Sequence, residues 1–217
     1  MTLLSTRAAN PDRAGSLAHR TRARRWTELL RTFPDLAEMR VLDLGGTPAS
    51  WRAAPVRPAQ VTVVNIDPGV AGDPEPDVQF LAADACQLPA LLPGVEFDLV
   101  YSNSLLEHLG GHANRARLAE VVAASASHHW IQTPYRYFPV EPHWLFPGMQ
   151  WLPFQVRVQI SQRWPYGHIR PGGRAKAIRD VAEVELLSAT EMRAYFPESD
   201  LWFERFAGLP KSLVARK

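Results

Sequence analysis

The chain of 217 residues has one cysteine, Cys86, and no apolar run approaching the roughly 20 residues that a membrane-spanning helix requires. A single cysteine excludes a disulfide scaffold. The formal net charge is only +2, so the chain lacks the strong positive charge that is typical of nucleic-acid binders. We therefore expect a cytoplasmic protein with no membrane span and no nucleic-acid partner.

The charges that are present are unevenly distributed. Residues 41–107 contain nine acidic residues and two arginines, whereas residues 1–40 contain eight arginines and four acidic residues. The acidic middle third indicates either a site for a cationic or donor-rich ligand or an acidic solvated surface. With 46% hydrophobic residues, the chain can build one dominant core.

Short apolar and β-branched runs alternate with helical patterns along the chain. The runs predict five strands, at residues 40–44, 61–66, 78–82, 97–101 and 130–132. Apolar residues at helical spacing predict a basic amphipathic helix over 16–33 and a second helix over 114–126. This alternation predicts an α/β fold with a Rossmann-like, doubly wound, mostly parallel sheet and helices on both faces.

The carboxyl-terminal part follows a different pattern. Ser188 and Glu191 form a capping-box signature that predicts the start of a helix. Two further strands are predicted at 201–206 and 212–215, on either side of a turn at 208–210. We expect this antiparallel hairpin to close one side of the sheet.

Residues 128–168 interrupt the alternation, because they combine ten aromatic residues with six prolines and four histidines. Such a segment could form a lid or a wall of a substrate site. It could equally be a proline-ordered loop that covers the sheet edge.

Three acidic residues lie at the carboxyl ends of the first three predicted strands: Asp43, Asp67 and Asp84. The carboxyl ends of strands in an open α/β sheet are where ligands bind. An acid at the end of the second strand can accept hydrogen bonds from a ribose diol. Asp43, just before Gly45 and Gly46, would repel a pyrophosphate, which disfavours a nicotinamide oxidoreductase. It suits a cofactor that carries ammonium and sulfonium groups.

At these positions the sequence resembles the class I S-adenosylmethionine-dependent methyltransferases, particularly the type-11-like group. The resemblance is carried by four stretches in order: Val41-Leu-Asp-Leu-Gly-Gly46, Val63-Val-Asn-Ile-Asp67, Ala83-Asp-Ala-Cys-Gln-Leu-Pro89 and Phe97-Asp-Leu-Val-Tyr-Ser-Asn-Ser-Leu-Leu-Glu-His108. It implies S-adenosylmethionine as cofactor. The implied cofactor-binding residues are Asp43, Gly45 and Gly46 at the methionine end, Asp67 at the ribose, Asp84 and Ala85 at the adenine, and Asn103.

The first loop departs from the family pattern, because threonine and alanine stand at the later glycine positions of Gly46-Thr-Pro-Ala-Ser50. Pro48 stiffens the loop and cannot donate a backbone hydrogen bond. We expect that the loop either binds the cofactor differently from the family pattern or is shaped by a missing or shortened first crossover helix, in which case Trp51 could pack over the site.

Methyl transfer to an alcohol needs a group that removes the hydroxyl proton. Two histidines are candidates: His108, which directly follows Glu107 after the fourth strand, and His143, which follows Glu141 and Pro142. Prolines on both sides of Val140-Glu141 restrict the backbone and would fix Glu141 and His143, so that a paired glutamate and histidine could position and activate a hydroxyl. We expect both histidines to face the acceptor, with either acting as the base. The same four side chains could instead bind a divalent ion such as magnesium that polarises the acceptor oxygen.

The expected acceptor is a small molecule, most readily a carbohydrate. Aromatic side chains that offer flat faces and polar groups are the expected substrate contacts: Tyr135, Tyr137, Trp144 and Tyr166. The chain is similar to small bacterial sugar O-methyltransferases, a group that includes methylmannose-polysaccharide 1-O-methyltransferases. This similarity implies O-methylation of a sugar. An aromatic or other natural-product hydroxyl, or a non-catalytic methyltransferase-like binding protein, are the alternatives.

These inferences predict a single domain over residues 1–217. Its parts are a basic N-terminal helical segment (1–40), a cofactor half (41–127), an aromatic and proline-rich acceptor segment (128–180), and a C-terminal helix and hairpin (181–217).

Overall fold

The computed structural model describes residues 17–90 and 95–217, so the first part of the predicted basic segment, residues 1–16, lies outside the described residues. A seven-stranded sheet has the order β3-β2-β1-β4-β5-β9-β8. Its strands are β1 (Arg40–Leu44), β2 (Gln60–Asn65), β3 (Val78–Ala82), β4 (Leu99–Asn103), β5 (His128–Pro134), β8 (Asp200–Phe206) and β9 (Leu209–Arg216). The first five pair in parallel, and β9 pairs antiparallel with β5 and β8. The predicted sheet and its C-terminal hairpin are confirmed.

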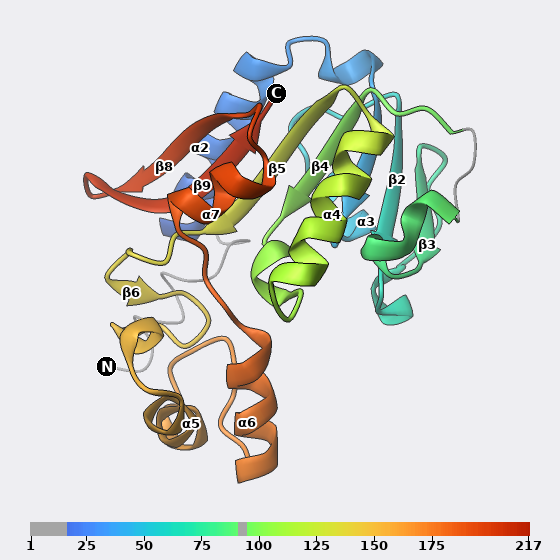
Figure 1. Ribbon diagram of the computed structural model, residues 1–217. Helices are drawn as coiled ribbons and strands as arrows, with labels where there is room; N and C mark the ends of the chain where they lie inside the picture. The colour runs from blue at the N-terminus through green and yellow to red at the C-terminus, as the bar shows by residue number, and fades with distance from the viewer. Residues whose placement is uncertain (1–16, 91–94) are drawn as a thin grey trace.

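Helices cover both faces of this sheet (Figure 1). The described residues form helices α2 (Leu17–Thr32), α3 (Pro48–Arg52), α4 (His112–Ser125), α5 (Phe154–Arg163), α6 (Arg174–Glu183) and α7 (Ala189–Tyr195), with short 3-10 helices η1 (Leu36–Glu38), η2 (Pro68–Val70), η3 (Ala85–Ala90), η4 (Leu106–His108) and η5 (Met149–Trp151). Helix α2 packs on one face of the sheet and α4 and α7 on the other, whereas α5 and α6 lie outside it. Within the described residues, no helix is long and apolar enough to cross a membrane.

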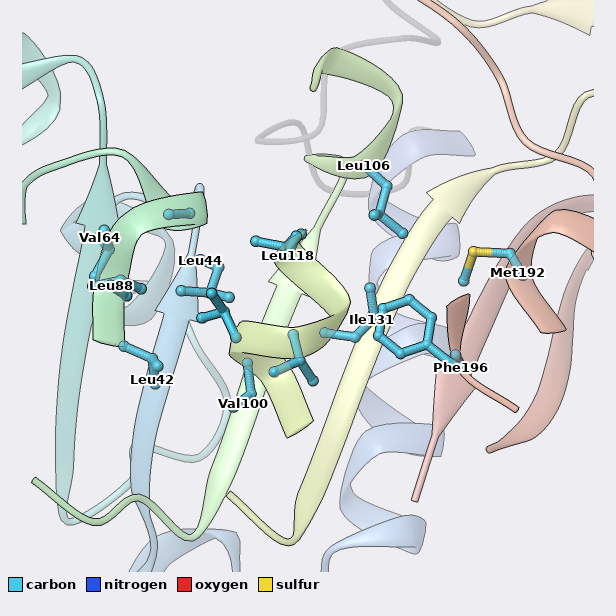
Figure 2. Packing of buried hydrophobic residues seen from close by; sticks show 14 of the residues in the cluster. Leu42, Leu44, Val64, Leu88, Val100, Leu106, Leu118, Ile131, Met192 and Phe196 are labelled. Atoms are coloured by element: carbon cyan, nitrogen blue, oxygen red, sulfur yellow. The ribbon is translucent and has the colours of Figure 1, made fainter. Parts of the chain in front are cut away.

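One apolar cluster fills the space between the sheet and α4, α7 and η3 (Figure 2). Leu42, Val100 and Ile131 point from neighbouring strands, and Leu118 of α4 meets them; all are at most 1% exposed. Alternate residues of the strands supply the cluster on the opposite face, where Val41 and Leu99 pack with Leu29 of α2. Because both faces are covered, the strands consist of nearly continuous apolar residues.

A third apolar cluster lies outside the sheet, in the segment that follows β5. This segment contains the hairpin of β6 (Val140–Glu141) and β7 (Phe146–Pro147), then η5, α5 and α6. Sequence analysis assigned no helices here. Figure 1 shows the segment as a separate layer beyond one edge of the sheet.

The predicted capping box is present at the start of α7. Ser188 accepts from the backbone N–H of Glu191, whose side chain accepts from the Ser188 backbone. The helix leads into the antiparallel pair of β8 and β9. The fourth strand begins two residues later than predicted, at Leu99, so Asn103 is its last residue.

Candidate functional site

Asp43 is a buried carboxylate at the end of β1. It is 1% exposed, and its Oδ2 accepts a hydrogen bond of 2.7 Å from Trp51 Nε1. Among the described residues, Oδ1 has no hydrogen-bond partner. Burial raises the pKa of Asp43 to about 7, and the hydrogen bond from Trp51 opposes this rise. The side chain is therefore placed to accept a further donor.

Two glycines form the turn after this strand. Gly45 has φ +81°, a conformation that residues with a side chain rarely adopt. A Cβ on Gly46 would lie 1.8 Å from Asp43 Oδ2, so the carboxylate occupies the space of a side chain. Asn65 Nδ2 at the end of β2 donates to the carbonyl oxygen of Gly46 at 2.9 Å and holds the turn. Sequence analysis gave Asn65 no role.

The first crossover helix is short, as expected from the loop sequence. Helix α3 has five residues, with Pro48 in its first turn and Thr47 as N-cap. The Thr47 side chain accepts from the backbone N–H of Ser50. This brief helix places Trp51, which is 2% exposed, against Asp43. Trp51 therefore packs against the carboxylate at the end of β1.

Asp67 and Asp84 lie just after the ends of the next two strands, β2 and β3. Asp67 is exposed and accepts from the backbone N–H of Gly69 at 2.8 Å. Asp84 is half-buried and accepts from the backbone N–H of Cys86 at 2.9 Å. Ala85, the first residue of η3, is 8% exposed and belongs to the core. The three acidic residues thus stand at one edge of the sheet, on adjacent strands.

A cavity of about 90 Å³ lies between helix α2 and this edge. Its lining includes Arg22, Arg25, Trp51, Tyr101 and Asn103. Arg25 forms an ion pair of 2.8 Å with Glu204 of β8 and donates to the side chain of Asn103. Sequence analysis gave the basic face of this helix no role, because the partners are far away in the sequence.

The predicted histidines come together near the same edge. His143 Nδ1 lies 2.7 Å from Glu141 Oε1, and its Nε2 lies 3.2 Å from His108 Nε2. Glu141 is 2% exposed, and its Oε2 accepts from the backbone N–H of Trp144 at 2.8 Å. Because an ionised carboxylate is an acceptor only, His143 carries hydrogen on Nδ1. Glu141 therefore sets the orientation of the ring.

Surroundings shift the pKa of the two histidines in opposite directions. Burial lowers the pKa of His143, but the hydrogen bond and charge of Glu141 and the charge of Glu107 outweigh it, so the pKa is raised above 6.5. His108 is exposed as a residue, but the protein around its ring removes part of the ring's hydration, and this desolvation, with a smaller effect of His143, lowers its pKa to about 4. His143 is thus the stronger base of the pair.

Glu107 is fully buried beside the histidines. Its Oε2 accepts from Thr133 Oγ1 at 2.9 Å, and its Oε1 has no partner among the described residues. Burial raises the pKa of this carboxyl, against weaker opposing effects of the groups around it. One donor atom each from Glu107, His108 and His143 lies within 4.8 Å of the others.

Buried Arg115 supports the short helix η4 that carries Glu107 and His108. Its Nε donates to the carbonyl oxygen of Leu106 at 3.0 Å, and its Nη2 pairs with Glu185 at 2.9 Å. The Glu185 backbone N–H in turn donates to the Glu107 carbonyl oxygen at 2.9 Å. Arg115 could not be predicted as a support of η4, because a single arginine in a helical sequence does not indicate contacts with distant residues.

A backbone contact fixes His143 from the other side. Its carbonyl oxygen accepts from the N–H groups of His168 and Ile169, at 2.7 and 3.1 Å. A Cβ on Gly167 would lie 2.4 Å from Trp144 Cα and 2.7 Å from the His143 oxygen. Only glycine fits there.

The structure contradicts one predicted acceptor contact. Trp144 is fully buried, and its indole N–H donates to Ser161 Oγ at 3.0 Å. It is a core residue of the third cluster and offers no surface to a substrate. Tyr137 and Tyr166 are 57% and 39% exposed, and Tyr135 is half-buried with its ring 5.5 Å from that of Tyr137.

The glycine turn and the histidine cluster are neighbours. A Cβ on Gly45 would lie 2.9 Å from Leu105 Cδ1, and Leu105 directly precedes η4. A ligand bound at the glycine turn would thus lie near Glu107 and His108.

This arrangement agrees with comparisons with known proteins. Residues 42–125 match the family model described as a methyltransferase domain. This part of the chain is a methyltransferase domain. It contains the three strand-end acidic residues, both turn glycines, Glu107 and His108. No curated protein matches it.

Solved structures share the fold beyond the methyltransferase domain. The N-methyltransferase NodS from Bradyrhizobium japonicum is 14% identical with a TM-score of 0.53, over 91% of this chain and 95% of that one. Magnesium protoporphyrin IX methyltransferase from Synechocystis, with bound S-adenosylhomocysteine, is 14% identical with a TM-score of 0.53, over 97% and 90%. A possible exported protein from Bordetella parapertussis is 20% identical with a TM-score of 0.54, over 93% and 68%. At these identities the likeness shows the fold.

Proposed function

We propose that the chain transfers the methyl group of S-adenosylmethionine to a hydroxyl oxygen of a small acceptor, a sugar or oligosaccharide. The observation that supports this proposal is that Glu141 contacts His143, which in turn contacts His108, beside the glycine turn. A buried carboxylate that orients a histidine is the arrangement by which proteins hold a general base in place.

The proposed cofactor site fits the charge of S-adenosylmethionine. Oδ1 of Asp43 is buried and unpartnered among the described residues, and an ammonium group would satisfy it. Exposed Asp67 would accept the ribose hydroxyls, and Asp84 with the Ala85 backbone would receive the adenine. Gly45 and Gly46 would let the backbone approach the methionine end, next to Asn103. When bound, the cofactor supplies a methyl group on a positively charged sulfur.

In the proposed reaction, His143 is the base. The acceptor oxygen forms its new bond to the methyl carbon while the carbon–sulfur bond breaks, and the hydroxyl proton passes to His143 Nε2. Glu141 stabilises the resulting positive ring through Nδ1. His108, whose pKa of about 4 keeps it neutral, orients the hydroxyl by a hydrogen bond.

The exposed aromatic side chains support a carbohydrate acceptor. Tyr137 and Tyr166 are exposed side chains of the acceptor segment, and Tyr166 adjoins Gly167, which packs against the backbone of His143. Sugars bind to such faces through their C–H groups while hydroxyls bond to nearby polar atoms. Magnesium, the ion considered from the sequence, prefers oxygen ligands, so a cluster with two imidazoles fits it poorly.

Cofactor binding is the first test. Calorimetry with S-adenosylhomocysteine should show binding to the wild type, and Asp67→Ala should weaken it at least tenfold. Asp73→Ala, on an exposed residue after η2, is the matched control and should bind like the wild type. No binding to the wild type would refute the enzyme assignment.

Methyl transfer from radiolabelled S-adenosylmethionine to a panel of sugars, phenols and amines is the second test. We expect a sugar to be methylated, and His143→Ala to lower kcat at least 100-fold with unchanged cofactor affinity. Transfer to phenols alone would favour the natural-product alternative. Cofactor binding without turnover on any acceptor would favour the non-catalytic alternative.

A further inference from the structure

We propose that His108, His143 and Glu107 together bind one divalent transition-metal ion of the zinc class, and that this ion receives the acceptor oxygen. The ion site follows from the positions of the donor atoms, which lie within 4.8 Å of one another. The placement of the acceptor on the ion rests on the proposed methyl transfer to a hydroxyl. In the ion-bound enzyme His143 is a ligand, and the ion's charge lowers the pKa of the hydroxyl so that its proton leaves to solvent.

The two imidazoles are oriented as metal ligands. Their Nε2 atoms are 3.2 Å apart, and the rings are nearly perpendicular, with an interplanar angle of 89°. Glu141 Oε1 lies 2.7 Å from Nδ1 of His143 and accepts its hydrogen. The Nε2 atom of His143 therefore keeps its lone pair, which points to His108. A carboxylate behind a ligating histidine is the usual outer partner in metal sites, where it fixes the tautomer and strengthens the ligand.

Glu107 supplies the negative charge of the site. It is fully buried, and its Oε1 lacks a hydrogen-bond partner among the described residues. A buried, unsatisfied carboxylate oxygen is costly, and a cation between it and the two rings would satisfy it. The hydrogen bond from Thr133 to Oε2 would hold the other oxygen in place.

The donor set selects the class of ion. Two imidazole nitrogens and one carboxylate oxygen suit Zn²⁺, Co²⁺ or Ni²⁺, whereas Mg²⁺ prefers oxygen ligands. Three protein ligands leave a coordination position open, as in catalytic zinc sites. The structure therefore revises the predicted set of four, because Glu141 contacts the ring of His143 and acts behind it.

The site is held in place and can be reached from solvent. Arg115 and the Glu185 backbone N–H donate hydrogen bonds to carbonyl oxygens of η4, and the backbone N–H groups of His168 and Ile169 donate to the His143 carbonyl oxygen. Rigid support of this kind favours metal binding, because little conformational entropy is lost when the ion binds. His108 is exposed, so an ion can enter from its side.

Cobalt binding tests the site without cofactor or acceptor. The full chain is treated with chelator, dialysed and titrated with Co²⁺, followed by visible absorption. We expect one equivalent to bind with the strong absorption of four- or five-coordinate Co²⁺, and one equivalent of Zn²⁺ to displace it. His108→Ala, at an exposed position, and Glu107→Gln should abolish the absorption. His128→Ala, an exposed histidine of β5, should leave it unchanged.

Glu141→Gln provides a graded variant. It should still bind Co²⁺ but about 10–100-fold more weakly, the effect known for outer partners of metal ligands. Circular dichroism confirms that each variant is folded. Absence of Co²⁺ absorption in the wild type, or equal absorption in His108→Ala, would overturn the metal site. Undiminished methyl transfer by the chelated enzyme would overturn the placement of the acceptor oxygen on the ion while leaving the proposed function intact. Co²⁺ binding without transfer to any acceptor would support the ion site and count against the function.

Discussion

The unusual pKa of Asp43 predicts that cofactor affinity depends on pH below neutrality. Burial raises this pKa to about 7, so the carboxyl is largely protonated at pH 6. An ammonium group binds the ionised form. The cofactor amine keeps its proton in this range, since α-amino groups titrate at about 7.7–8.0. Affinity should therefore increase as pH rises from 6 to 7.

The size of the effect follows from the fraction of Asp43 that is ionised. If only the ionised form binds, the apparent Kd is the intrinsic Kd multiplied by 1 + 10^(pKa − pH). With a pKa of about 7, this factor is about 11 at pH 6 and about 2 at pH 7. The Kd of S-adenosylhomocysteine should thus fall about fivefold over this interval.

Calorimetry of the wild type, Asp43→Asn and Trp51→Phe at both pH values is the assay. The asparagine side chain cannot ionise, so the first variant should bind weakly at both values with no pH dependence. The second variant loses the hydrogen bond that lowers the pKa of Asp43, so its increase in affinity should move to higher pH. A wild-type Kd that changes less than twofold, or an unchanged pH dependence in Asp43→Asn, would refute the reasoning.

The same shift affects folding. Between pH 4 and about 7 the folded chain keeps a proton on Asp43 that the unfolded chain has released, so this group stabilises the fold at low pH and the benefit is lost as pH rises through about 7. Urea unfolding across this range should show that stability falls less steeply with pH in Asp43→Asn. Parallel curves for both proteins would contradict the assigned pKa.

Three further predictions concern the histidine cluster. Gly167→Ala should lower kcat at least tenfold without changing S-adenosylhomocysteine affinity, because the new Cβ displaces the backbone of His143; normal turnover would exclude this support. In enzyme freed of divalent ions by chelator, Glu141→Gln should shift the pH–rate midpoint to lower pH, because it removes the charge that raises the pKa of His143; an unmoved midpoint would exclude His143 as the base of the ion-free enzyme. Arg115→Met should lower the free energy of unfolding in urea by about 2–4 kcal/mol, because two buried carbonyl oxygens lose their donor, whereas exposed Arg117→Met should change it by less than about 0.5 kcal/mol.

Much of the sheet could be predicted from local sequence. The run at 40–44 ends at two glycines, and the run at 78–82 is bounded by turn residues. The hydrophobic pattern and these turn residues were therefore enough to predict both strands. The segment after β5 could not be predicted in this way. Its prolines and aromatics resemble those of a loop, and α5 and α6 are stabilised by contacts of Trp144, Val158 and Val181 with one another.

From sequence alone, the alternation of strand and helix patterns determined the fold class. The strand ends and the motifs determined the positions of the carboxylates and placed a glutamate close to each histidine in the chain. These depend on neighbours in the chain and on strand order. Tertiary structure decided which of the four side chains share one space: His143 meets His108 across 35 residues, and Glu141 lies behind the ring. It also removed Trp144 from the acceptor site by burying it. Such contacts form between segments that are far apart in the sequence, so no local sequence pattern marks them.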